Sequence, residues 1–194
     1  MVALLSPLFA YLSSFGSLNE DDKALLEARI QYRELPQRYL LEQAGLVGRH
    51  YYYFIIKGAV RAYQLGEDGL ETTFRFSFEN SLEGAFDSLR SGEPATGYLE
   101  LLEPTQLLTI NREDLHDLRR LSPNLRAITD EITNYWMGRL ADRLIQFRAM
   151  SATQKYDWVQ QQYPGITNRV ALSYIASYLG LSVETLSRIR AKRH

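Results

Sequence analysis

The sequence predicts an α+β protein in which an antiparallel barrel or roll of short strands is flanked by helices and followed by a small helical domain. Short runs rich in Tyr, Phe, Val and Ile, broken by Gly and Pro, extend from about residue 30 to residue 110. Helical periodicity precedes and follows these runs. Because no long helical segment separates successive runs, a parallel sheet is disfavoured.

Composition excludes several classes of function. The 194 residues suffice for one large or two small domains, and none of them is Cys. A disulfide scaffold, a zinc finger, an iron–sulfur cluster and a thiol nucleophile are therefore excluded. The three histidines do not stand at metal-ligand spacing, so we expect no metal. Since no run of 18 apolar residues occurs and the apolar N-terminal stretch lacks a basic start, we expect a cytoplasmic protein with no membrane partner.

The N-terminal two thirds divide into a helical segment and six candidate strands. Residues 4–29 are predicted to be helical, with Ser17-Leu18-Asn19-Glu20 offering a cap. The candidate strands are RYLLEQ, HYYYFIIKG, AVRAYQL, ETTFRFSF, YLELLE and QLLTI. Leu65–Gly69 is predicted to be a hairpin turn, because Asp-Gly tolerates the positive φ that such turns require. Strand alternation places Phe74, Phe76 and Phe78 on one face.

A long helix is predicted next. Asn111 or Ser122 is a candidate cap, and Pro123 suits the first turn. Its apolar stripe consists of Leu125, Ile128, Ile132, Trp136, Leu140, Leu144 and Phe147. We interpret this stripe as a dimerisation surface, and burial against the roll alone is the alternative. The boundary between two domains is expected near Met150, at the end of this helix. The expected domains are therefore residues 1–150, which include the dimerisation helix at about 122–150, and residues 151–194.

The C-terminal segment carries a helix-turn-helix pattern. In VALSYIASYLGLSVETLSRIR, Gly180 is expected to end one helix and Ser182 to cap the next. The second helix then exposes Glu184, Thr185 and Arg188, of which Arg can pair with a guanine edge and Glu with a cytosine amino group. Residues from 151 onward carry a net charge of +4 and the first 150 carry −5. This asymmetry favours nucleic acid as a partner. The alternative is a plain two-helix hairpin with a solvated cationic end.

These motifs resemble the Crp/Fnr superfamily, the catabolite-activator type of bacterial transcription regulator. IASYLGLSVETLSRIR resembles its recognition module, and YYYFIIKGAVRAY resembles a segment of its β-roll, with Gly45 at an earlier turn. The helix from Ser122 to Met150 stands where the family has its dimer helix. SATQKYDWVQQQYPGITNRV resembles the helix that leads into the DNA-binding domain, especially in a Bacteroidetes-like branch.

The resemblance implies a β-roll of the cyclic-nucleotide-binding-domain type (a double-stranded β-helix), a homodimer, and a C-terminal helix-turn-helix. We expect little or no wing after it, because the printed sequence ends at His194. By position, Ser182 would contact a phosphate, Glu184, Thr185 and Arg188 would read base edges, and Lys192 and Arg193 would reach the DNA backbone. The implied partners are double-stranded DNA, a second copy of the chain and a small-molecule effector, with RNA polymerase as a further candidate.

The chain departs from the family's nucleotide-binding pattern, which is a Gly-Glu pair followed by Arg, Ser or Thr, and a small residue. In SLEGAFDSLRSGEPATGYLEL, Ala85 takes the glutamate place and no Arg stands at Pro94–Gly97. A buried phosphate without a cation is costly, so we expect no cofactor and no tight binding of cAMP or cGMP. A pocket is still expected. Its candidate lining residues are Phe74, Arg75, Gly84, Phe86 and Tyr98; the alternative is that these aromatic residues simply fill the roll.

The predicted function is that of a homodimeric DNA-binding transcription regulator of the Crp/Fnr type whose effector the sequence does not name. The alternative is a small-molecule or protein-interaction sensor that does not bind DNA and carries a vestigial helix-turn-helix. We expect no enzyme activity. The chain has neither the His-x-His of a cupin-like metal site nor the Gly-x-Ser-x-Gly of a hydrolase.

Overall fold

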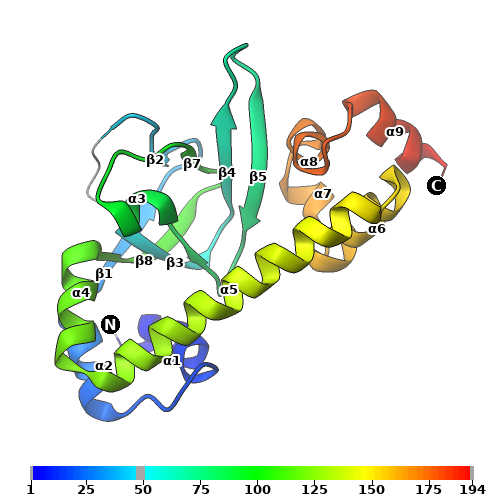
Figure 1. Cartoon of the computed structure of the whole chain (residues 1–194). Helices are drawn as coiled ribbons and strands as arrows, with labels where there is room; N and C mark the ends of the chain where they lie inside the picture. Colours follow the sequence, from blue (N-terminus) through cyan, green and yellow to red (C-terminus); the bar gives the residue numbers. More distant parts are fainter. Residues whose placement is uncertain (1, 47–50, 193–194) are drawn as a thin grey trace.

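A β-roll, a long helix and a group of short C-terminal helices make up the chain (Figure 1). The structure is a computed structural model that describes residues 2–46 and 51–192. Within these residues the strands are β1 (Gln31–Leu35), β2 (Leu40–Glu42), β3 (Tyr51–Lys57), β4 (Val60–Leu65), β5 (Glu71–Ser77), β6 (Leu82–Glu83), β7 (Tyr98–Leu101) and β8 (Thr105–Asn111). They form two antiparallel sheets in the orders β1-β8-β3-β6 and β2-β7-β4-β5.

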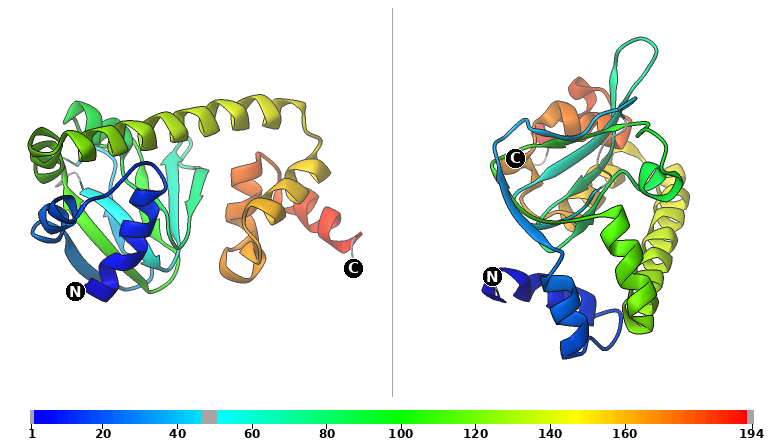
Figure 2. Two further views of the ribbon diagram at one scale, coloured as in Figure 1. Left: turned by 90° about the horizontal axis from the view of Figure 1, so that it is seen from below. Right: turned by 90° about the vertical axis from the view of Figure 1, so that its left-hand side faces the viewer.

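Helices cover the outside of the roll and extend beyond it. In the described residues they are α1 (Val2–Ser13), α2 (Glu20–Glu27), α3 (Phe86–Ser91), α4 (Arg112–Leu121), α5 (Pro123–Ala149), α6 (Ala152–Gln162), α7 (Ile166–Arg169), α8 (Leu172–Leu179) and α9 (Val183–Ala191). The long α5 runs from the N-terminal helices past the roll to α6, and the β4–β5 hairpin projects beyond the roll (Figures 1 and 2).

Strand alternation builds two cores from the same sheet. On β3, Tyr53 and Ile55 point into the roll, whereas Phe54 points outward into a cluster formed with α1, α2, α4 and α5. On β8, Leu107 and Leu108 divide in the same way. Because both faces are buried, the strands are rich in apolar residues, as the sequence indicated.

Most predicted elements are present, with three additions and one division. All six predicted runs contain strands, and the Leu65–Gly69 turn is confirmed, with Gly69 at φ 77°. The strands β1 and β6 and the helix α3 were not predicted. The helical segment expected over 4–29 is two helices, and Asn19 caps the second in a reciprocal capping box with Asp22.

The predicted alternation on β5 is wrong at Phe74. The pairing with β4 matches Ala62 with Arg75 and Tyr63 with Thr73, so that Phe74 is the extra residue of a β-bulge. As a result Phe76 is 2% exposed in a core, whereas Phe74 is 37% exposed. The bulge therefore turns the Phe74 side chain away from the face that Phe76 occupies.

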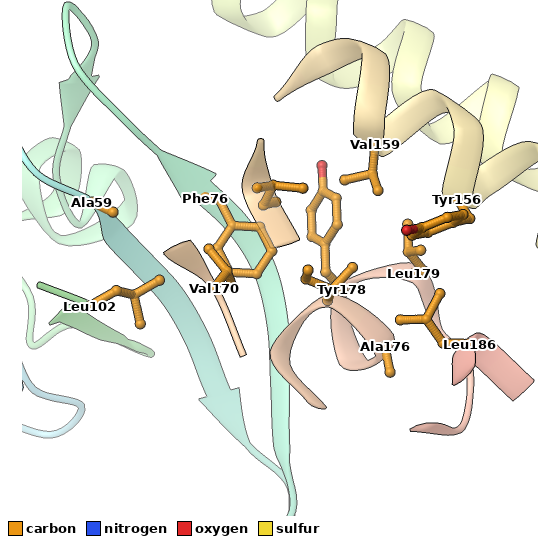
Figure 3. Packing of buried hydrophobic residues seen from close by; sticks show 12 residues of the cluster. Ala59, Phe76, Leu102, Tyr156, Val159, Val170, Ala176, Tyr178, Leu179 and Leu186 are labelled. Carbon is orange, nitrogen blue, oxygen red and sulfur yellow. The ribbon is translucent and has the colours of Figure 1, made fainter. Parts of the chain in front are cut away.

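The C-terminal helices pack directly against the roll. Ala59, Phe76 and Leu102 of the roll share one apolar cluster with residues of α6 to α9 (Figure 3). The rings of Phe76 and Tyr178 lie 5.2 Å apart, centroid to centroid. The long helix ends at Ala149, next to the expected boundary, but the apolar core continues across that boundary.

Arg169 adds a charged network to this contact. Its guanidinium donates to both carboxylate oxygens of Glu79, at 2.9 and 2.7 Å, and to the carbonyl of Gly58 at 3.1 Å. It also pairs with Glu103. The hydrogen bonds from Arg169 lower the pKa of Glu79 from its ordinary 4.5 to about 2. The network thus joins α7 to the loops that follow β3, β5 and β7.

Replacing Arg169 by Gln is expected to lower the free energy of unfolding by about 1–2 kcal/mol, because it leaves two half-buried carboxylates without their charged donor. Urea titration at pH 7 measures this loss. The control is Arg126→Gln, which removes an exposed guanidinium from α5 and should have little effect.

The same pair of proteins tests the pH dependence. Since the pKa of Glu79 is depressed, the pairing stabilises the fold above about pH 4.5 and is lost as the pH falls towards 2. The stability difference between wild type and Arg169→Gln should therefore shrink over that window. A difference that stays constant from pH 5 to pH 2 contradicts this assignment.

Candidate functional site

The turn between α8 and α9 has the geometry that the sequence predicted. Gly180 is left-handed at φ 66°, and its N–H donates to the carbonyl of Ser177 at 3.1 Å. The N–H of Leu181 donates to the carbonyl of Ala176 at 2.9 Å. This pair of hydrogen bonds is a Schellman motif, which ends α8 and reverses the chain within a few residues.

The start of α9 is fixed by its cap and its core contact. The Ser182 hydroxyl accepts a hydrogen bond from the Thr185 N–H at 3.2 Å. Leu186 is fully buried against the preceding helices, and Ile189 packs at the edge of the same cluster. The opposite side of α9 is therefore left to solvent.

The predicted base-reading residues share this free side. Glu184 and Arg188 are exposed, and Arg188 donates to the Thr185 hydroxyl at 3.3 Å. Hydrogen bonds from its own backbone N–H and from Ser182 hold the pKa of Glu184 below its usual range, so it is ionised at neutral pH. Lys192 is exposed at the end of the helix, and Arg193 lies outside the described residues.

This face offers the chemistry that base recognition requires. A guanidinium can donate two hydrogen bonds to a guanine edge, and a carboxylate can accept from a cytosine amino group. Arg188, Arg190 and Lys192 give the C-terminal half of α9 a positive charge. Positive charge on an exposed helix suits contact with phosphates on either side of a groove.

The other helix of the pair, α8, is held by β5. The Ser177 hydroxyl accepts from the Thr73 N–H and donates to the Glu71 carbonyl, both at 2.9 Å. The ring of Tyr174 lies 3.7 Å from the guanidinium of Arg61, which is 1% exposed. Sequence reasoning missed these contacts, because a short polar residue on a helix gives no signal that it bridges to a distant strand.

A cavity of about 250 Å³ lies on the other side of β5. All five predicted pocket residues line it: Phe74, Arg75, Gly84, Phe86 and Tyr98. Gln64, Ala85, Thr96, Gly97 and Leu99 complete the lining. The bulge at Phe74 explains why that side chain reaches the cavity although Phe76 belongs to the core on the opposite side.

The arginine that lines this cavity in the described part of the chain is already paired. Arg75 Nε donates to Glu83 Oε2 at 2.9 Å, and its Nη2 donates to the other carboxylate oxygen. Glu83 is fully buried and also accepts from the Ser77 hydroxyl at 2.6 Å and the Gly84 N–H at 2.8 Å. Sequence reasoning named Arg75 as a lining residue but missed its pairing with Glu83, which depends on how β5 and β6 meet.

The apolar stripe of α5 divides between several contacts. Leu125, Ile128 and Ile132 are buried in the protomer's own core, which corrects their assignment to a dimer surface. Trp136 packs on the same core and donates from its indole to the Tyr11 hydroxyl at 3.1 Å. Phe147 packs against the C-terminal cluster. The apolar stripe of α5 therefore contacts different elements along its length: the core beside α1 and α2 at its start and the C-terminal cluster at its end.

The middle of α5 keeps an uncovered apolar surface. It consists of Met137, Leu140, Leu144 and Ile145, which are between 43% and 70% exposed. Their spacing of three, four and one residues places them on one side of the helix. We call this group the α5 patch.

Nowhere in residues 2–46 and 51–192 do three His, Asp or Glu side chains gather as a metal site would require. The helices of these residues include none with the length and apolar character needed to cross a membrane.

Comparison with known proteins places this architecture. Residues 32–121 match the cyclic nucleotide-binding domain. The chain is 26% identical over 148 residues to the regulatory protein HlyX of Actinobacillus pleuropneumoniae, covering 71% of this chain and 61% of that protein. It is 27% identical to the fumarate and nitrate reduction regulatory protein of Escherichia coli K12, covering 71% and 58%.

The fold agrees with these similarities. The structure matches that of the c-di-GMP-responsive global regulator CLP of Xanthomonas campestris, with a TM-score of 0.69, 19% identity, and coverage of 90% and 91% of the two chains. The protein thus combines a cyclic-nucleotide-binding-type β-roll with a C-terminal helical module. The chain is similar in sequence to these regulatory proteins and in fold to CLP, in agreement with the resemblance to Crp/Fnr regulators noted in its sequence. It spans 61% and 58% of the lengths of the two relatives named.

Gly180→Ala is expected to lower the free energy of unfolding by about 1–2 kcal/mol, because an L-residue is strained at a positive φ. A Cβ there would meet no neighbour, so the cost comes from the backbone alone. The control is Gly138→Ala in α5, where a Cβ is equally unhindered. The free energy of unfolding of that variant should rise by about 0.5–1 kcal/mol, because Ala is more stable than Gly inside a helix. Equal effects of the two substitutions in urea unfolding would contradict the assigned turn.

Proposed function

We propose that this protein is a homodimeric, sequence-specific DNA-binding transcription regulator. The observation that carries the proposal is the free face of α9, where Glu184 and Arg188 are exposed and Thr185 is half-buried. The start of this helix, the turn before it and its packing partner are all fixed. In this proposal α9 enters the major groove, Ser182 contacts a phosphate, and Lys192 and Arg193 follow the backbone.

The similarities support the same function. HlyX and the fumarate and nitrate reduction regulatory protein are regulatory proteins by name, and CLP is described as a global regulator. We accordingly propose a cytoplasmic protein without enzyme activity, with a sensor domain over 1–150 and a DNA-reading domain over 151–194. RNA polymerase is a further proposed partner.

Dimerisation in this proposal uses the α5 patch. A second copy would pack its own α5 patch against this one, with the two helices parallel or antiparallel. This contact would bury four apolar side chains that are exposed to solvent in the single chain. A two-fold axis there would present two copies of α9 to successive major grooves.

Control by a ligand is proposed to pass through β5. Phe74 and Arg75 line the cavity, whereas Thr73 and Phe76 contact Ser177 and Tyr178 of α8. A molecule that moves the Phe74 side chain also acts on the bulge. The Thr73 N–H, which donates a hydrogen bond to the Ser177 hydroxyl of α8, is next to that bulge. We propose that occupancy of the cavity thereby changes how α8 and α9 are held, and that cAMP and cGMP do not bind tightly.

Arg188→Ala tests the recognition helix. Loss of a base-reading guanidinium is expected to weaken the free energy of DNA binding by about 1–3 kcal/mol per half-site, measured on a DNA site selected by the wild-type protein. Fluorescence anisotropy at two salt concentrations measures the affinity. Arg126→Ala removes the same charge from an exposed position outside α9 and should cost far less. Unchanged affinity in Arg188→Ala, or binding that is weak and unaffected by salt, would favour a sensor that does not bind DNA.

Leu144→Glu tests the dimer surface. A carboxylate at the centre of the α5 patch is expected to give monomers in sedimentation, because it would be buried without a partner. Gln146→Glu introduces a carboxylate two residues away on the opposite side of α5, and it should leave the dimer intact. A dimer that persists in Leu144→Glu would place the interface elsewhere.

A further inference from the structure

We propose that the cavity beside β5 takes an uncharged, planar aromatic molecule, and that Glu83 is the residue that keeps anions out. This inference deepens the proposed function, because it names the chemical class of the effector. Its test involves no DNA, so its failure and the failure of the DNA-binding proposal are separate results.

Aromatic rings dominate the cavity wall. Phe74 and Phe86 are 37% and 40% exposed although they are large apolar residues, and both face the cavity. The Tyr98 ring is stacked on Tyr63 at 4.9 Å with an interplanar angle of 11°, which presents it as a fixed surface. Exposed phenyl rings at the wall of a cavity gain contact area when another ring packs on them.

Two glycines leave bare peptide surface beside these rings. A Cβ on Gly97 would lie 2.9 Å from the Tyr63 carbonyl oxygen, and a Cβ on Gly84 would lie 2.6 Å from the Leu89 side chain. The rings of Phe74 and Phe86 would be in ordinary contact with these Cβ atoms, at 3.7 Å. The wall therefore consists of flat ring and peptide surfaces with few projecting side chains. A flat molecule fits such a wall better than a branched one.

The charge of the lining is balanced before any ligand arrives. Among the residues that line the cavity in the described part of the chain, Arg75 is the sole cation. Glu83 takes its Nε and Nη2 donors, and Nη2 also contacts the Gly84 carbonyl at 3.2 Å. An anion placed beside Arg75 would face a fully buried carboxylate on the same guanidinium. Two like charges sharing one cation are disfavoured.

The paired guanidinium still offers its flat surface to a ring. Its central carbon lies 4.9 Å from the centroid of Phe86 and 5.7 Å from that of Phe74. Guanidinium planes stack on aromatic rings even when their edges are hydrogen-bonded. Arg75 therefore continues the aromatic wall, and Glu83 cancels the charge that would otherwise attract a phosphate.

The volume limits the ligand to a small ring system. A cavity of about 250 Å³ is slightly smaller than most ligand pockets, which have volumes of roughly 300–1,000 Å³, and it suits a bicyclic aromatic molecule. The Gln64 side chain at the rim can give or accept one hydrogen bond. A single neutral polar substituent on the ring is thus accommodated.

The test compares two probes that share a ring system and differ in charge. 2-Naphthol is neutral at pH 7 and 2-naphthalenesulfonate is an anion. In isothermal titration against the full chain we expect 2-naphthol to bind, the sulfonate to bind at least tenfold more weakly, and Phe74→Ala to weaken 2-naphthol binding at least tenfold. Absence of 2-naphthol binding, equal affinities, or no effect of Phe74→Ala overturns the proposal.

Glu83→Gln tests the assigned role of the carboxylate. The amide retains acceptor and donor groups but releases the charge of Arg75, so sulfonate affinity is expected to rise at least tenfold. Glu67→Gln at the exposed hairpin tip changes the net charge equally and should leave both affinities unchanged. Circular dichroism establishes that each variant is folded. If Glu83→Gln does not fold, the probe pair on wild type and Phe74→Ala still decides the proposal; if it folds with no gain, the role of Glu83 is refuted.

Discussion

The packing of α8 against β5 is the constraint on which the arrangement of the molecule depends. One hydroxyl, that of Ser177, takes the place of a strand partner for two backbone groups just before the bulge, the Thr73 N–H and the Glu71 carbonyl. Three further contacts join the C-terminal helices to the roll around this hydroxyl. The Arg61–Tyr174 and Phe76–Tyr178 contacts bury aromatic surface, and the Arg169 network pairs charges. Buried backbone groups without hydrogen bonds lower the stability of the fold, so the C-terminal helices have one favoured position on the roll. This position sets the direction of α9.

The strand β5 contributes both to the cavity and to the packing surface for the C-terminal helices. One side of β5 contributes to the cluster that holds α8, and the bulge directs Phe74 to the cavity on the other side. Bulges are local irregularities that re-aim side chains and end regular pairing. This is the physical basis on which the proposed ligand control rests.

Local chemistry explains which parts could be predicted from sequence. Gly180, Ser182 and the hairpin at Gly69 were predicted because caps and turns are set by neighbouring residues. The bulge, the Arg75–Glu83 pair and the Ser177 bridge join residues whose proximity depends on the register between strands and helices. The stripe on α5 shows the same limit: its period predicted a helix, but the period does not say which turn faces which neighbour. The five predicted lining residues nonetheless all line the cavity, and three of them, Gly84, Phe86 and Tyr98, lie in the segment where the nucleotide-binding pattern was sought.

The central claim is that two copies of α9 read DNA together. The most direct test is selection of bound sequences from a random DNA pool, first at low salt and then at physiological salt. The account predicts an enriched two-fold-symmetric motif whose half-sites lie about one helical turn apart, with affinity that falls steeply as salt rises. A pool that shows no enrichment, with only weak binding at low salt, would contradict it.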